Sequence, residues 1–274
     1  MSNKTQLEFY CTRWGSENIP WEVFINFVKA SGYDGIEYGI VSDASPAILD
    51  HVWNLASKQG LKMIPHHYDT VTTEFSRHQQ QFEAWFELVS AYEAEKINVQ
   101  SGRDCFDFAA NEKLIRFTEG YQKSKGVQVV HETHRQRCLF AAHVAREFLE
   151  KIPSLRLTLD ISHWVCVAET FLGDQTEAVN LALQRTEHVH ARVGYPQGPQ
   201  ISDPRAPEWE SALATHLNWW RAVAKQLVNL NKTLTITPEF GPPPYMPCHP
   251  YTGQPCANQW EVNLYMMNLL RHEL

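Results

Sequence analysis

Short runs rich in apolar and β-branched residues alternate with longer helical patterns from one end of the chain to the other. This alternation predicts a parallel sheet built from βαβ units. We expect eight strands, over residues 7–11, 36–38, 61–68, 96–100, 127–133, 155–160, 187–193 and 233–239. A helical stretch follows each of them, and no linker or change in composition interrupts the series.

Eight such units in 274 residues match the usual length of a (β/α)₈ barrel. The expected helices begin near residue 20 and cover 46–58, 75–92, 112–124, 139–151, a region reaching 184, 208–229 and 259–271. An open doubly wound sheet is the alternative, but it calls for a glycine-rich phosphate loop after the first strand, which residues 12–16 do not provide. We therefore expect one α/β domain over 1–274, a single closed (β/α)₈ barrel.

The charge and the apolar pattern exclude several classes of protein. The formal net charge is −7, which argues against nucleic acid as a partner because nucleic-acid binding depends on a basic face. No run approaches about 18 uninterrupted apolar residues, so no membrane-spanning helix is expected. The segment from Met1 to Gln6 is polar and has no apolar core, so we expect no secretory signal and a cytoplasmic location. A small-molecule substrate suits this composition.

Polar or ionisable residues stand at the end of nearly every expected strand. A single residue of this kind is usually a cap or a satisfied hydrogen-bonding group. In a barrel, however, the C-terminal strand ends meet at one mouth, so the repetition indicates a functional site. The residues are Trp14, Glu37, His66, His67, Gln100, Glu132, His134, Asp160, His163, His190, Arg192 and Glu239.

Four of these residues form a candidate metal shell on strands five to eight: Glu132, Asp160, His190 and Glu239. Three carboxylates and one imidazole suit one divalent cation, Mn²⁺ or Mg²⁺ first, and leave positions open for substrate oxygens. Zn²⁺ and Co²⁺ are compatible with the same ligands. The alternative is a hydrogen-bonded polar plug without metal, in which at least one crowded carboxylate would have to take up a proton.

Strand seven places three polar side chains on one face. His188, His190 and Arg192 are two residues apart, and strand side chains alternate with that period. His190 lies nearer the mouth and is the better ligand, whereas His188 is expected deeper in the barrel. Arg192 is a candidate for binding a substrate carboxylate, phosphate or hydroxyl, or for neutralising the ring of acids.

Four segments resemble the sugar-phosphate isomerase/epimerase superfamily, the xylose isomerase-like barrels that also include endonuclease IV (AP endonuclease family 2). They are His-Glu-Thr-His at 131–134, Leu-Asp-Ile-Ser-His-Trp at 159–164, His-Val-His-Ala-Arg at 188–192 and Pro-Glu-Phe-Gly-Pro at 238–242. By this resemblance the four shell residues carry over as metal ligands. In the ketose 3-epimerase branch the two glutamates, here Glu132 and Glu239, are also the acid/base pair. His163 carries over as a substrate-binding residue, and His67 matches a histidine often found after strand three.

The resemblance implies a metal-dependent sugar isomerase or epimerase. A metal that chelates a carbonyl and the adjacent hydroxyl acidifies the neighbouring C–H, so one glutamate can remove the proton and the other return it. Trp14 would add an apolar wall against the sugar. The residues expected to bind substrate are Trp14, Glu37, His67, His134, His163 and Arg192.

The sequence also departs from these relatives. The further glutamate that follows the strand-five ligand in the epimerase branch is missing from residues 134–138. No arginine stands at that branch's position after strand seven, and Arg192 and Arg205 are the candidates for its role. A trinuclear zinc site for DNA repair would need more histidines at the strand ends. A metal-dependent dehydratase of a cyclic polyol ketone and a non-catalytic sugar-binding barrel remain the alternatives.

Two long Pro-rich loops, 194–209 and 242–257, follow the last two strands. Loops of this length in a compact domain are commonly lids or contact surfaces. The sequence leaves both interpretations open, a lid over the site or a contact within a homo-oligomer.

Overall fold

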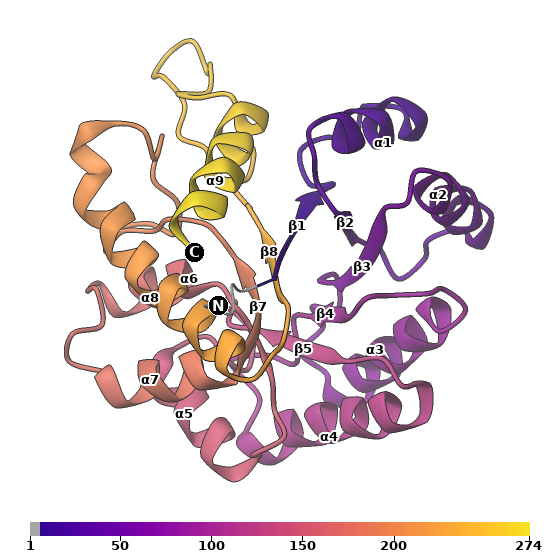
Figure 1. Ribbon diagram of the computed structural model, residues 1–274. Helices are drawn as coiled ribbons and strands as arrows, with labels where there is room; N and C mark the ends of the chain where they lie inside the picture. Colours follow the sequence, from indigo (N-terminus) through magenta and orange to yellow (C-terminus); the bar gives the residue numbers. More distant parts are fainter. Residues whose placement is uncertain (1–5) are drawn as a thin grey trace.

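In the computed structural model, which describes residues 6–274, eight parallel strands close into a barrel within a ring of helices (Figure 1). The strands are β1 (Leu7–Thr12), β2 (Gly35–Gly39), β3 (Lys62–His67), β4 (Ile97–Val99), β5 (Val129–Glu132), β6 (Leu157–Leu159), β7 (Thr186–His190) and β8 (Leu234–Thr237). They neighbour one another in chain order, and β1 pairs with β8 to close the barrel. The predicted fold is confirmed. Residues 1–5, most of the segment in which we expect no secretory signal, lie outside the described residues.

The helices follow the expected order, although several begin or end a few residues from the expected positions. They are α1 (Trp21–Ala30), α2 (Pro46–Lys58), α3 (Phe75–Val89), α4 (Phe108–Lys125), α5 (Ala142–Lys151), α6 (Ile161–Ala168), α7 (Thr176–Arg185), the 3₁₀ helix η1 (Pro207–Trp209), α8 (Glu210–Asn229) and α9 (Gln259–Glu273). Helix α4 begins before residue 112 because the Asp107 side chain accepts a hydrogen bond from the Ala110 N–H and caps it. The helical region ending near 184 is two helices, separated where Glu169 and Leu172 adopt left-handed backbone.

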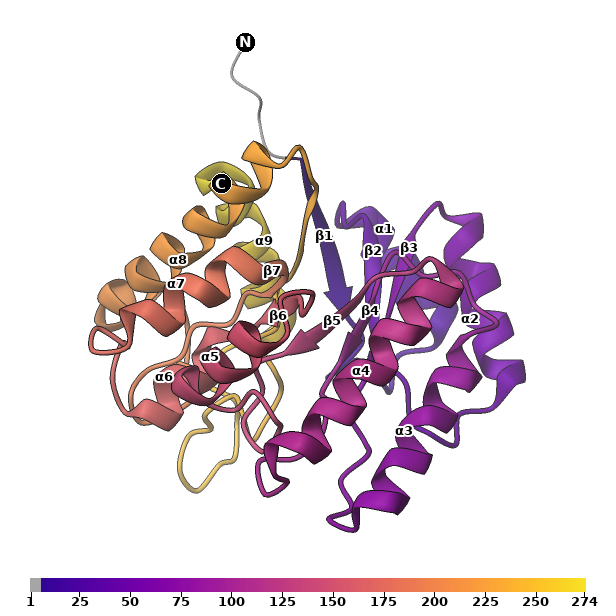
Figure 2. The same cartoon turned by 90° about the horizontal axis from the view of Figure 1, so that it is seen from below.

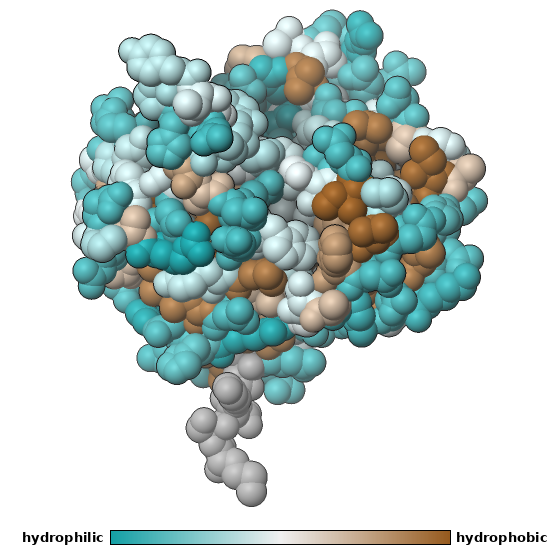
Figure 3. Space-filling view, turned by 90° about the horizontal axis from the view of Figure 1, so that it is seen from above, coloured by the Kyte–Doolittle hydropathy of each residue, from teal (hydrophilic) through white to brown (hydrophobic). Residues whose placement is uncertain are grey.

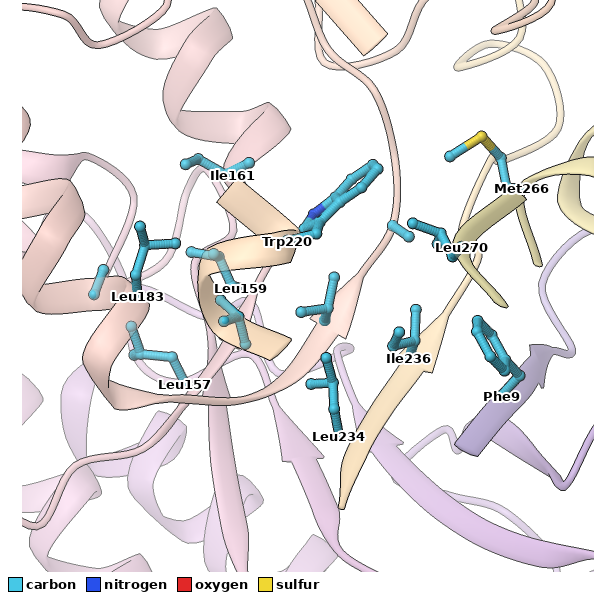
Figure 4. Packing of buried hydrophobic residues seen from close by; sticks show 14 of the residues in the cluster. Phe9, Leu157, Leu159, Ile161, Leu183, Trp220, Leu234, Ile236, Met266 and Leu270 are labelled. Carbon is cyan, nitrogen blue, oxygen red and sulfur yellow. The ribbon is translucent and has the colours of Figure 1, made fainter. Parts of the chain in front are cut away.

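The apolar residues of the strands point outward to the helices. Leu157 and Leu159 on β6 and Leu234 and Ile236 on β8 are buried and belong to one core cluster. Figure 4 shows this packing, with Trp220 of α8 and Met266 and Leu270 of α9 beside the strand residues. This layer between sheet and helices contributes the apolar burial that stabilises the barrel.

The alternate strand residues point into the barrel and are largely polar. Thr158 of β6, His188 and His190 of β7 and Thr235 and Thr237 of β8 are all fully or almost fully buried. Branched apolar side chains usually fill the interior of such barrels. Buried polar groups are stable only when hydrogen-bonded, so this interior must hold a connected network.

The two ends of the barrel differ in character. Figure 2 shows the β1 arrowhead pointing away from the N-terminus, toward the end where the long loop between β8 and α9 hangs. The opposite end is closed by ion pairs: Lys62 Nζ lies 2.8 Å from Glu8 Oε1, and Lys232 Nζ lies 2.8 Å from Glu187 Oε1. The C-terminal strand ends lie at the other end, where barrels of this fold usually carry their functional groups.

The outer surface is mixed. On the face drawn in Figure 3 hydrophilic residues predominate, and apolar residues gather along one side. Within residues 6–274, none of the helices combines the length and apolar character needed to cross a membrane.

Candidate metal centre at the barrel mouth

The four residues of the predicted shell come together. One ligand atom from each of Glu132, Asp160, His190 and Glu239 lies within 4.8 Å of the others, and all four side chains are buried. Glu132 and His190 are the last residues of β5 and β7, whereas Asp160 and Glu239 lie just beyond β6 and β8. His190 Nδ1 is 2.9 Å from Glu239 Oε2 and 3.5 Å from Glu132 Oε1.

Glu37 sets the orientation of the His190 ring. Its Oε1 lies 2.9 Å from His190 Nε2, so the carboxylate accepts the proton that this nitrogen carries. Nδ1 is buried and lies 2.9 Å from Glu239 Oε2, but within the described residues its contacts do not have the geometry of a hydrogen bond. A histidine whose second nitrogen is fixed by a carboxylate is the usual arrangement of an imidazole metal ligand.

Glu37 is the centre of the interior network and does not reach the mouth. Asn98 Nδ2 donates to its Oε1 at 2.8 Å, Thr237 donates to Oε2, and His188 Nε2 lies 3.1 Å from Oε2. Burial favours the protonated acid, but His190 and His188 outweigh it and hold the pKa of Glu37 well below its usual value. Predicted as a substrate-binding residue, Glu37 is placed by the structure beneath the centre, as a support of His190.

Asp160 is held from two sides. It is the N-terminal cap of α6, where Oδ1 accepts from the Ser162 N–H at 3.1 Å, and its Oδ2 is bonded to Arg192. Burial raises the pKa of Asp160 to about 6, against the lowering effect of Arg192. Arg192 also lies 2.8 Å from His163 Nε2 and 3.7 Å from Glu239 Oε2. It thus neutralises part of the ring of acids, one of the two roles predicted for it.

Two further predicted histidines lie beside the shell. The His134 and His163 rings are 4.0 Å apart, and each offers a nitrogen within 4.8 Å of the other and of a Glu132 oxygen. Burial lowers the pKa of His134 to about 4, so this ring is neutral at neutral pH. His134 lines the cavity described next, whereas His163 is fully buried behind it.

A cavity of about 630 Å³ opens at the mouth above the shell. Of the twelve strand-end residues singled out in the sequence, seven line it: Trp14, His66, Gln100, Glu132, His134, Arg192 and Glu239. Asp160, His190, Glu37, His67 and His163 are not among the lining residues. The two glutamates are therefore the shell members that a molecule in the cavity can touch.

His67 lies away from the cavity in an aromatic setting. Its Nε2 is 2.8 Å from Thr70 Oγ1, and its ring packs edge-on against Phe82 and Trp85. The neighbouring residue, His66, lines the cavity instead, with Nε2 3.1 Å from Glu132 Oε2. Adjacent strand residues face opposite sides, so only one of the pair can point inward.

Several cavity residues were not predicted. Tyr38 and Tyr68 lie at the ends of β2 and β3, and Arg13, Arg137 and Tyr245 belong to loops. Arg192 lies under the Tyr245 ring, 4.7 Å from its centroid, and Trp14 meets the same ring edge-on at 5.0 Å. Tyr38 and Tyr68 directly follow Glu37 and His67, so their position at strand ends could have identified them from the sequence. No feature of the sequence around Tyr245 indicates that it lines the cavity.

The chemistry of the donors fits a hard divalent cation. Three buried carboxylates surround one imidazole whose Nδ1 has no hydrogen-bond partner within residues 6–274. Burial opposes a charged imidazole, yet the charges of Glu239, Glu37 and Glu132 raise the pKa of His190 well above its usual value. The site thus stabilises positive charge at this point, which a proton on Nδ1 or a cation bound there can supply.

The fold and the site together define a (β/α)₈ barrel with an acidic, histidine-containing centre at its C-terminal mouth. Residues 15–243 match the family described as xylose isomerase-like TIM barrel. The chain belongs to this family. No match was found among curated proteins.

Solved structures share the fold over nearly their whole length. A xylose isomerase domain containing protein from Salmonella typhimurium has a TM-score of 0.64 at 14% identity, covering 97% of this chain and 96% of its own. A probable 3-DHS dehydratase, AsbF, from Bacillus anthracis scores 0.62 at 13% identity, with 97% and 99% covered. A D-psicose 3-epimerase solved in the presence of D-fructose scores 0.60 at 13% identity, with 98% and 99% covered. At these identities the likeness establishes the fold and leaves the reaction open.

Proposed function

We propose that the protein is a metal-dependent isomerase or epimerase of a sugar-like substrate, with Glu132, Asp160, His190 and Glu239 as ligands of one divalent cation. The observation that carries the proposal is the buried Nδ1 of His190, which faces carboxylate oxygens and has no hydrogen-bond partner within the described chain. Mn²⁺ and Mg²⁺ suit the oxygen-rich set best, and Zn²⁺ and Co²⁺ also match the ligand types.

Glu132 and Glu239 are the proposed proton carriers. Both line the cavity, and they come from strands β5 and β8, which are three positions apart around the barrel. When bound, the cation would polarise a substrate carbonyl and acidify the adjacent C–H. One glutamate then removes that proton and the other delivers a proton to the same carbon or to its neighbour.

Other residues have supporting roles in this proposal. Gln100 Nε2 donates to Glu132 Oε2 at 3.0 Å, which fixes one carboxylate oxygen and leaves the other toward His190. Trp14 and Tyr245 form an aromatic wall on which the C–H face of a sugar can pack. His134 presents a neutral imidazole to the cavity and can bind a substrate hydroxyl.

Metal binding is the first test. Chelator-treated wild type and Glu239→Gln would be titrated with Mn²⁺, Co²⁺, Mg²⁺ and Zn²⁺ by calorimetry, with Tm recorded for each. We expect binding of one ion per chain that raises the Tm of wild type, with weaker binding by the variant. Glu17→Gln is the matched control, since Glu17 is an exposed glutamate at the same mouth. No binding by wild type would contradict the metal centre.

Proton transfer is the second test. Ketoses, aldoses and inosose-like ketones would be incubated with the metal-loaded protein in D₂O and followed by NMR. Incorporation of solvent deuterium next to the carbonyl, with an isomeric product, supports the proposal. Loss of water from the substrate would identify a dehydratase using the same glutamates. If a sugar binds to both wild type and Glu132→Gln but neither incorporates solvent deuterium into it, the protein would be a sugar-binding protein and not an enzyme.

A further inference from the structure

The guanidinium of Arg137 forms part of the wall of the mouth cavity. Arg137 is only 4% exposed and lies in the loop between β5 and α5. Its Nη1 donates to the Thr70 carbonyl at 2.6 Å, and its Nη2 donates to the Tyr68 carbonyl. Its Nε is buried and has no hydrogen-bond partner among residues 6–274. Part of the donor capacity of this group is therefore unused.

The positive charge of Arg137 has no carboxylate partner. Throughout residues 6–274 it takes part in no ion pair, whereas the neighbouring Arg192 is paired with Asp160 and lies near Glu239. Burial lowers the pKa of Arg137 to about 10, so the guanidinium stays charged at neutral pH. A buried charge is costly unless an opposite charge or hydrogen bonds compensate it. Backbone carbonyls compensate Arg137 in part and supply no opposite charge.

The rest of the site does not pair with Arg137 either. Glu17, the third carboxylate among the lining residues beside Glu132 and Glu239, is exposed and forms no ion pair with Arg137. With a dication bound, the three carboxylates of the shell balance the ion together with Arg192. Glu37 is committed to the histidines below. Much of the remaining wall is aromatic, formed by Trp14, Tyr38, Tyr68 and Tyr245. A bound neutral sugar would leave Arg137 without a carboxylate at ion-pair distance, with only the longer-range charges of Glu132 and Asp69 acting on it.

We propose that the substrate carries a carboxylate that binds Arg137 while its carbonyl and hydroxyl end faces Glu132 and Glu239. This proposal rests on the proposed function and adds the substrate class, an acidic sugar or polyhydroxy acid. A buried guanidinium that lines the cavity and forms no ion pair can pair with the single charge of a carboxylate. The Nη protons that the Thr70 and Tyr68 carbonyls do not use can donate charge-assisted hydrogen bonds to a carboxylate, and these are stronger than hydrogen bonds to a neutral hydroxyl.

The test compares pairs of sugars that differ only in the charged group. D-Glucuronate with D-glucose, and D-galacturonate with D-galactose, would be titrated into manganese-loaded wild type, with intrinsic tryptophan fluorescence as the readout because Trp14 lines the cavity. We expect at least one uronate to bind about tenfold or more tightly than its neutral partner, the range for a charge-assisted hydrogen bond. D-Glucose 6-phosphate is the third probe. A preference for the phosphate over every uronate would overturn the carboxylate assignment.

Variants separate recognition from folding. Arg137→Gln should abolish the preference for the uronate over its neutral partner, while Arg137→Lys should keep part of this preference. Arg116→Gln, on the exposed side of α4, is the matched control and should keep the full preference. If Arg137→Gln does not fold, two other measurements test the role of Arg137. Arg137→Lys should have a smaller preference for the uronate than wild type, and added salt should weaken uronate binding by wild type more than binding of the neutral sugar.

The outcomes also separate this proposal from the proposed function. Equal binding of charged and neutral sugars by wild type, or a preference that survives in Arg137→Gln, would refute the role of Arg137. Manganese binding measured in the same samples tests the metal centre independently. If the protein binds manganese but shows no preference for the uronates, the proposed function stands and the proposal of an acidic substrate is refuted.

Discussion

Glu37 Oε1 lies 2.9 Å from Nε2 of His190, in the interior of the barrel below the mouth. Both side chains are buried, and the contact joins the second strand to the seventh. Because the carboxylate occupies Nε2, the other ring nitrogen is left facing Glu132 and Glu239. A residue that does not line the cavity therefore decides which ring nitrogen of His190 faces the carboxylates of the shell.

Glu37→Gln is expected to weaken Mn²⁺ binding by about 10- to 100-fold, the usual effect of removing the hydrogen-bond partner of a metal-bound histidine. The amide keeps the shape of the side chain but no longer provides a second acceptor oxygen and a charge. Calorimetric titration of the chelator-treated protein measures the change. Glu17→Gln serves as control, and equal affinity in the two variants would contradict the supporting role of Glu37.

Asn98→Ala tests the network that holds Glu37. The Asn98 side chain is fully buried, donates to Glu37 Oε1 at 2.8 Å and accepts from Thr158 Oγ1 at 2.7 Å. Its loss leaves two buried polar groups short of a partner, so we expect a decrease of about 1–3 kcal/mol in the free energy of unfolding. Urea unfolding of this variant and of Asn54→Ala, an exposed position on α2, gives the comparison. A difference within error would show that water or rearrangement replaces the bonds.

The barrel and the shell were predictable because both depend on local patterns. Strand side chains alternate with period two, so a polar residue that ends an apolar run in each of several parallel strands reaches the same mouth. Glu132 and His190 illustrate this, as the last residues of their strands. The place of Glu37 was harder to predict because β2 runs on to Gly39, beyond the expected end at 38, and its register sets Glu37 beside Thr12 and Ile64.

The loops were less predictable because long-range contacts fix them. Arg137 is held at the cavity by hydrogen bonds to carbonyls of the loop after β3. One of these carbonyls belongs to Thr70, which is 67 residues from Arg137 in the sequence. Tyr245 packs edge-on against Trp14, which lies near the other end of the chain. The Arg192 guanidinium lies against the face of the same Tyr245 ring. No periodicity or motif encodes contacts of this kind, so sequence reasoning identified the four residues that meet at the mouth and missed much of the wall of the cavity.

Metal affinity is expected to fall as the pH falls. The pKa of His190 is raised by the surrounding carboxylates, and burial raises the pKa of Asp160 to about 6, so below these values both ligands carry protons that a cation must displace. Each displaced proton lowers the affinity by about tenfold per pH unit. Mn²⁺ titrations from about pH 8 to about pH 5 measure the slope. Circular dichroism at each pH checks that the fold persists, and a flat profile would contradict the assignment of these two ligands.

Gly241→Ala tests whether the aromatic wall of the cavity affects sugar binding independently of the metal centre. A Cβ at Gly241 would lie 2.1 Å from an atom of the Trp14 ring, so the ring must move out of its place beside Tyr245. The backbone here cannot yield easily, because Gln200 donates to the Gly241 carbonyl and accepts from its N–H. We expect sugar binding to weaken by about tenfold, the effect of losing roughly one stacking contact, while Mn²⁺ binding stays unchanged. Gly173→Ala, where an added Cβ meets nothing within 4 Å, should alter neither. If Gly241→Ala weakened manganese binding as much as sugar binding, the wall and the centre would not be separable, and Trp14 would have to act on the shell itself.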